Sequence, residues 1–175
     1  MKRLMILIMA LFLVLGISSG TVLAEPSLDA TADIFAVVLE AFDVTNIDDL
    51  DFGTLVAPTD TTGTVTVNAD GTIATNNIPY HDGVVEAATF EITGGFSVNG
   101  DDSISYSVEL PDSETITNGN GGTMTVDNFT SNLTENQGFI TSTNEEFSVG
   151  ATLNVGAAQE AGSYNGSFEV TVIIE

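Results

Sequence analysis

Carboxylates are the side chains of this sequence that are best suited to chemistry, because they are numerous and locally crowded. They gather in three short stretches of the chain: Asp48, Asp49 and Asp51, then Asp101 and Asp102, then Glu145 and Glu146. Calcium takes about six to eight oxygen ligands from carboxylates, amides and backbone carbonyls, and an acidic loop can supply them. The calcium candidates are therefore Asp48, Asp49, Asp51, Asp101 and Asp102. A solvated acidic surface is the favoured alternative, because the spacing matches no EF-hand or nonapeptide calcium loop.

The other residue types that carry catalysis are scarce. His81 is the only histidine and the chain has no cysteine, so we expect neither a zinc site nor a thiol nucleophile. A hydrolytic triad would need a hydroxyl and an acid converging on His81, and a glycosidase would need two acids flanking a sugar cleft. No pattern singles out such residues, so we expect no catalytic residues, no cofactor and no enzymatic activity. Glycan binding is thinly supported, because there is no tryptophan and Tyr80 is the one tyrosine in a loop-like stretch, Ile78–Gly83.

The elements that must position these residues are strands. Apolar residues alternate with small or polar ones along 103–110, 147–155 and 164–174, which is the pattern of a strand with one face in a core and one in water. Stretches rich in Asn, Asp and Gly, such as 68–71 and 118–122, separate these runs and favour tight turns. We predict an all-β, antiparallel Greek-key β-sandwich, immunoglobulin-like or pilin-like, with about eight or nine strands.

Aromatic residues and glycines on these runs give a first picture of the core. The best core candidates are Phe52, Phe90, Tyr164 and Phe168. Gly53 follows an aromatic residue where an acidic stretch enters a strand, so it is expected to permit a bend or a close backbone approach. Gly166 lies in the middle of an alternating run, and we expect an aromatic ring to lie across its backbone.

The segment Ala30–Val44 is long, strand-prone and apolar on both faces around Ile34–Leu39. One interpretation is a central strand that is buried on both sides. The other is a donor strand that completes the sheet of a neighbouring subunit. The sequence leaves both open, with the central strand favoured.

The N-terminus is typical of an export signal. Lys2 and Arg3 precede an apolar run, Leu4–Leu15, and Val22–Ala24 has the small residues of a cleavage site. The run is shorter than the roughly 20 apolar residues that span a bilayer. We predict a signal peptide over 1–24 and a single β-sandwich domain over 25–175, without a membrane span. The protein is then extracellular or at the cell surface, after periplasmic transit if the cell is Gram-negative.

Charge excludes several classes of partner. The formal net charge is −23, and Lys2 and Arg3 are the only basic side chains besides the histidine, so signal removal leaves −25. Such a surface repels nucleic acid and anionic lipid, and neither is expected as a partner. Acidity of this kind fits high salt, bound divalent cations or simple solubility. The absence of cysteine excludes a disulfide framework.

Six short motifs occur along the chain in a characteristic order: Leu50–Leu55, Gly63–Val67, Ala88–Gly94, Gly122–Val126, Val149–Val155 and Gly162–Val172. In that order they resemble a secreted bacterial family known only as a domain of unknown function, DUF4402. The resemblance covers nearly all of the chain from about Ala30 onward. It brings no catalytic residues with it.

The opening "LDFG" and the closing "GSYNGSFEVTV" are more loosely similar to spore-coat protein U and to archaic chaperone–usher pilins. That similarity implies a β-sandwich subunit of a surface fibre or coat. Those proteins commonly carry a disulfide, which this chain lacks. We therefore expect a secreted or cell-surface structural protein, such as a pilus, coat or matrix subunit, that binds itself or other surface proteins by strand addition. The alternative is a calcium- or glycan-binding extracellular module.

Overall fold

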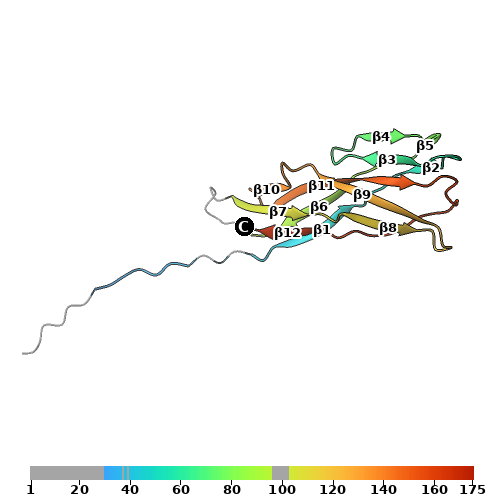
Figure 1. Cartoon of the computed structure of the whole chain (residues 1–175). Coiled ribbons are helices and arrows are strands. Elements are labelled where there is room, and N and C mark those ends of the chain that lie inside the picture. Colours follow the sequence, from blue (N-terminus) through green and yellow to red (C-terminus); the bar gives the residue numbers. More distant parts are fainter. Residues whose placement is uncertain (1–29, 37, 39, 96–102) are drawn as a thin grey trace, which may run out of the picture. The chain divides into compact units, whose positions relative to one another are not determined.

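The described residues form twelve β-strands, all paired antiparallel (Figure 1). The computed structural model describes residues 30–36, 38, 40–95 and 103–175, and no helix is assigned among them. The strands are β1 (Asp43–Asp48), β2 (Thr54–Val56), β3 (Gly63–Val67), β4 (Ile73–Asn76), β5 (Tyr80–Asp82), β6 (Ala88–Thr93), β7 (Ile104–Glu109), β8 (Ser113–Thr117), β9 (Thr123–Ser131), β10 (Gln137–Ile140), β11 (Asn144–Val155) and β12 (Thr171–Ile174). By its contacts the chain divides into two units, Met1–Ala36 and Val37–Glu175, and all of the strands belong to the second.

β11 organises the larger, seven-stranded sheet. One edge of β11 pairs first with β6, over Asn144–Val149, and then with β3, over Ala151–Val155. The opposite edge pairs with β9 over Val149–Asn154. β1 and β4 extend this sheet beyond β6 and β3, and β8 extends it beyond β9. A single strand therefore holds most of the sheet together.

Two smaller sheets complete the fold. β7 is the central strand of a three-stranded sheet, between β10 and β12. β2 and β5 form a separate pair. The face of the larger sheet that carries Ile92 and Phe147 packs with the face of the three-stranded sheet that carries Tyr106, Val108 and Ile140. The two sheets therefore face each other as a sandwich.

Alternation along β11 builds both halves of the interior. Phe147 and Val149 belong to one buried cluster, between β6, β7, β10 and β11. Ala151, Leu153 and Val155 belong to the other, with residues of β3 and β9. The polar residues between them lie on the opposite face, as the period of two requires.

Gly150 marks the point where β11 changes partner from β6 to β3. A Cβ atom placed on Gly150 would lie 2.2 Å from the carbonyl oxygen of Val67 and 2.6 Å from the amide nitrogen of Ala69. The pairing with β9 shifts register between Gly150 and Thr152, opposite Asn128, whose φ is 51°. The crossing therefore needs a residue without a side chain on β11 and a bulge on β9.

The predicted fold class is confirmed, and the differences lie in the number and extent of the strands. Twelve strands replace the expected eight or nine, because short pairs such as β2 and β5 were not separable from turns. The run 164–174 was expected to be one strand, yet only β12 is assigned there, with one isolated bridge between Asn165 and Thr117. A buried central strand over Ala30–Val44 was also wrong: among its described residues, only Asp43 and Val44 lie in a strand, β1. The predicted signal peptide, 1–24, lies outside the described residues.

The four aromatic residues predicted for the core do contact it, but they are not fully buried. Phe52, Phe90, Tyr164 and Phe168 pack against the two clusters and are half-buried. The fully buried aromatic residues are Tyr106 and Phe147.

An aromatic ring was predicted to lie across Gly166, but the structure has such a ring at Gly138 instead. Gly166 faces the Ile116 side chain, whereas a Cβ on Gly138 would lie 2.4 Å from Cζ of Tyr106. Gly53 does make the expected close approach: its φ is 72°, and a Cβ placed on it would lie 2.8 Å from Asp82 O.

Candidate functional site

The acidic stretch after β1 was the first candidate site. Asp48, Asp49 and Asp51 are all exposed. The backbone of Asp51 bridges to Glu86 through two hydrogen bonds of 3.0 and 3.1 Å, and its carboxylate accepts a 2.7 Å hydrogen bond from Gly53 N–H. One oxygen of Asp51 is therefore occupied by the turn that leads into β2.

The other calcium candidates, Asp101 and Asp102, lie outside the described residues. Within the described part of the chain, no three His, Cys, Asp or Glu side chains come close enough together to hold a metal ion. Calcium binding by Asp48, Asp49 and Asp51 thus remains a prediction from sequence, without a preformed cluster of acids to support it.

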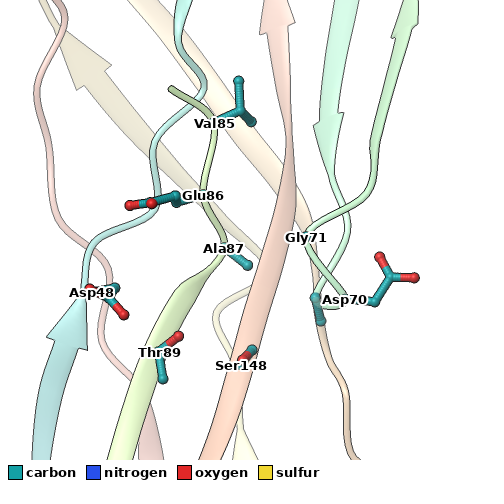
Figure 2. Close-up of a pocket in the computed structure, with 9 residues that line it drawn as sticks. Asp48, Asp70, Gly71, Val85, Glu86, Ala87, Thr89 and Ser148 are labelled. Atoms are coloured by element: carbon teal, nitrogen blue, oxygen red, sulfur yellow. The ribbon is translucent and has the colours of Figure 1, made fainter. Parts of the chain in front are cut away.

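A shallow hollow of about 310 Å³ lies on the outer face of the large sheet, next to Asp48. Cross-strand pairing places Asp48 of β1 opposite Thr89 of β6, and Thr89 opposite Ser148 of β11. Glu86 and Asp70 complete the polar rim. In Figure 2 the carboxylate of Asp70 points away from Asp48 and Glu86, so the three acids do not converge.

Asp70 is engaged in the turn between β3 and β4. Its Oδ1 accepts hydrogen bonds from the backbone N–H of Thr72 at 2.9 Å and from the Thr72 hydroxyl at 2.5 Å. These bonds, with the hydroxyl the stronger influence, lower the pKa of Asp70 below its usual value. The turn is closed by Gly71 N–H, which donates to Asn68 O at 2.9 Å. Asp70 therefore has a structural role that the sequence did not single out.

A second hollow, of about 570 Å³, lies between the end of β7 and the bulge of β9. Its polar side chains contact their neighbours in the chain. Asn128 Nδ2 donates to Asp127 at 2.9 Å, and Asn136 Oδ1 accepts from the Ser131 hydroxyl at 2.7 Å. These hydrogen bonds order the connection between β9 and β10.

His81 and Tyr80 lie in a strand rather than in the loop that their neighbours indicated. Both belong to β5, where His81 pairs with Leu55 of β2. His81 is half-buried, with Nε2 2.8 Å from Phe52 O. The Tyr80 hydroxyl donates to Asp82 at 2.9 Å, and Gly83 N–H and Tyr80 together lower the pKa of Asp82. The His81 contact ties β5 to the residue pair that precedes β2, and the Asp82 hydrogen bonds order the end of β5.

Exposed apolar residues form the most unusual feature of the N-terminal segment. The exposed fractions of Ile34, Phe35 and Val38 are 95%, 88% and 92%, and residues 30–36 carry no strand. The first backbone hydrogen bond along the described part of this segment is at Glu40, whose carbonyl accepts from Gly95 N–H at 3.2 Å. Phe42 is half-buried and packs against the cluster around Phe147.

The order of the strand motifs is the feature that places this chain among known proteins. A family model described as Domain of unknown function (DUF4402) matches residues 42–173, from just before β1 into β12. The chain belongs to the DUF4402 family. No curated protein and no solved structure matches it. DUF4402 membership assigns no site residues, and the exposed segment before Phe42 lies outside the matched range.

Among the residues that the structure describes, no helix is long and apolar enough to cross a bilayer.

Proposed function

We propose that this protein is a secreted or cell-surface structural subunit, of a pilus, coat or matrix, without catalytic activity. It associates with other copies by β-strand addition, using the N-terminal segment as the added strand. The observation that carries the proposal is the exposure of Ile34, Phe35 and Val38 in a segment without a strand. Full burial of one such side chain stabilises an association by about 1.5–3 kcal/mol.

Strand addition also suits the backbone of this segment. An extended peptide that pairs with a sheet edge gains a row of main-chain hydrogen bonds, and its alternate side chains fill apolar positions. Residues 34–39 are all apolar and lie between Asp33 and Glu40. An added strand of these six residues would place about three apolar side chains on each face. A charged residue would lie at either end.

Electrostatics opposes self-association of this chain. From residue 4 onward there is no Lys or Arg, so two copies bring together carboxylates without compensating cations. Salt screens this repulsion, with a Debye length of about 8 Å at physiological ionic strength and about 3 Å at 1 M. We therefore expect assembly of the mature protein to increase with ionic strength.

The test removes residues 34–39 from the mature protein and measures its size by sedimentation velocity over a series of NaCl concentrations. The deletion stops before Phe42, because Phe42 packs into the folded core. We expect the deletion to leave the thermal melt nearly unchanged and to abolish the salt-dependent assembly.

The matched variants replace exposed apolar residues by serine. Ile34→Ser, Phe35→Ser and Val38→Ser together should act like the deletion, whereas Val84→Ser, at a side chain that is 64% exposed elsewhere, should assemble normally. Assembly that is unaffected by the deletion would contradict the proposed function.

A further inference from the structure

The turn between β8 and β9, residues 118–122, contains two Asn-Gly pairs in succession. A third pair, Asn165–Gly166, lies next to the same turn, because Asn165 bridges to Thr117. A fourth, Asn99–Gly100, lies outside the described residues. Asn-Gly pairs are prone to lose the side-chain amide without an enzyme, because glycine has no Cβ to obstruct the reaction. The three described pairs have different surroundings, and these decide which one reacts.

The reaction joins the asparagine side chain to the following peptide bond. The backbone nitrogen of the glycine attacks Cγ of the asparagine, a C–N bond forms, and Nδ2 leaves as ammonia with the proton of the glycine N–H. Water then opens the resulting five-membered succinimide. Attack of water on the side-chain carbonyl gives aspartate, and attack on the main-chain carbonyl gives isoaspartate, whose backbone runs through the former side chain. The reaction therefore needs a mobile side chain, a peptide plane that can rotate and a glycine N–H without a partner.

The first pair of the turn is locked by hydrogen bonds and packing. Oδ1 of Asn118 accepts from both Asn120 N–H and Gly122 N–H at 2.9 Å. Nδ2 of Asn118 is buried, and a Cβ placed on Gly122 would lie 3.0 Å from Cγ of Asn118. The Gly119 N–H donates to the Thr117 hydroxyl at 3.2 Å. Neither the side chain of Asn118 nor the attacking nitrogen of Gly119 is free to react.

The pair Asn165–Gly166 is held through its backbone. Asn165 N–H donates to Thr117 O, and Asn165 O accepts from Thr117 N–H, both at 3.0 Å. The second of these bonds fixes the peptide plane that contains the Gly166 nitrogen. A Cβ placed on Gly166 would lie 2.7 Å from Cγ2 of Ile116, so this plane has little room to rotate.

The pair Asn120–Gly121 is free in each respect that the reaction requires. Both residues are exposed, and a Cβ placed on Gly121 would have no atom within 4 Å. The side chain and carbonyl of Asn120 and the N–H of Gly121 make no hydrogen bond to any described residue. We propose that Asn120 is a site of spontaneous deamidation, through a succinimide with Gly121, that yields aspartate and isoaspartate at position 120. This inference is independent of how the protein assembles.

The isoaspartate product alters the turn that joins β8 to the sheet. Asn118 Oδ1 accepts from the N–H groups on both sides of the reacting pair, those of Asn120 and Gly122. Isoaspartate adds one methylene to the backbone between these two groups, so they no longer reach one acceptor atom together. Among the described strands β8 pairs with β9 alone, so β8 is sensitive to the geometry of this turn. Deamidation therefore loosens the β8 edge as the protein ages.

The first test follows the whole mature protein at mildly alkaline pH, folded and in concentrated guanidinium chloride. From residue 4 onward no Lys or Arg offers a trypsin site. Digestion after glutamate instead gives one peptide, 115–135, that contains Asn118 and Asn120, and another, 161–169, that contains Asn165. Fragment mass spectrometry of these peptides locates the converted asparagine and separates aspartate from isoaspartate.

The folded protein should convert Asn120 at least about tenfold faster than Asn118 or Asn165, because the slower sites must first break two hydrogen bonds. In guanidinium chloride the three rates should converge, because the reacting pair is the same at each site. Conversion of Asn118 or Asn165 as fast as Asn120 in the folded protein would overturn the proposal. So would an Asn120 that stays intact in the folded protein while it converts in denaturant.

The second test measures the effect on β8 with Asn120→Gln as the matched control. The φ of Asn120 is not positive, so glutamine fits the backbone there, and its longer side chain does not form the five-membered ring. Both proteins are aged together and compared by hydrogen exchange. Amides of Ser113–Thr117 should exchange about tenfold faster in the isoaspartate form of the native protein than in aged Asn120→Gln, because two hydrogen bonds of the turn are lost. Equal exchange in the two aged proteins would contradict the loosening of β8.

Discussion

β11 and the C-terminal segment, residues 166–174, have the same alternating sequence pattern and different structures. In β11, the stretch Val149–Asn154 lies between strands on both edges, and the apolar side chains of residues 147–155 are buried. In the C-terminal segment, only Thr171–Ile174 form a strand, paired on one edge, and Phe168, Val170 and Val172 are half-buried. Alternation decides which side chains face the core. Full burial along β11 accompanies a strand that lies in the interior of its sheet, whereas the C-terminal segment has a strand on one side only.

The difference shows how a sheet edge can be recognised from its packing. A residue that faces a core but stays half-exposed, beside unpaired backbone, lacks a neighbour on that side. Matched substitutions in the two regions therefore measure how much a neighbouring strand contributes to the free energy of unfolding of the isolated subunit.

The largest expected effect is at the aromatic positions. Phe147→Ala removes a fully buried ring that stacks on Phe90 with centroids 5.4 Å apart, and should lower the free energy of unfolding by about 3–5 kcal/mol. Phe168→Ala, at a half-buried ring, should cost about 2 kcal/mol in the monomer. Urea denaturation in low salt gives both values. Equal losses would mean that the C-terminal edge is already covered.

A smaller effect is expected at the two glycines. Gly150→Ala would press a methyl group against the backbone of Val67, and should cost about 1–3 kcal/mol. At Gly166 the nearest atom is Cγ2 of Ile116, at 2.7 Å, which belongs to a side chain on the edge strand β8. Gly166→Ala should therefore cost about 1 kcal/mol or less. The comparison is contradicted if Gly166→Ala is the more destabilising of the two in thermal or urea unfolding.

The smallest expected effect is the pH dependence from the turn beside β11. The folded-state pKa of Asp70 lies below its ordinary value because of the Thr72 hydroxyl and N–H, so its charged form stabilises the fold. That contribution is present above the unfolded pKa of about 3.9 and is lost as the pH falls through the folded value. Asp70→Asn should be less stable than the native protein at pH 7, and the difference should vanish at low pH. A difference that is the same at pH 7 and pH 2 would rule out the carboxylate as its source.

Much of the fold could be predicted because a strand with one buried face has an apolar residue at every second position. The alternation at Phe147–Val155 located β11 to within three residues of its start. The same rule failed for β1, because none of Asp43–Asp48 is buried and their side chains carry no alternation. It also failed for Phe168 and Val170, which face the core as predicted but have no strand partner.

The candidate site was less predictable. His81 looked like a turn residue because Pro79 and Gly83 flank it, although the β2–β5 pair depends on contacts with residues some thirty positions earlier in the chain. The clustering of Asp48, Asp49 and Asp51 in sequence did not produce converging side chains, because neighbouring residues near a strand end point in different directions. Exposure of Ile34 and Phe35 could not be read from a run that is equally suited to a buried strand.

Because β11 contributes residues to both buried clusters, it couples the unfolding of the two halves of the interior. Phe147 and Val149 anchor one cluster and Leu153 and Val155 the other, and one continuous backbone joins them. Neither half can open without disturbing the other, so amides on β3, β6 and β9 should exchange with solvent through a shared cooperative event. The C-terminal segment pairs with β7 alone among the described strands, so its amides should exchange before those of β3, β6 and β9.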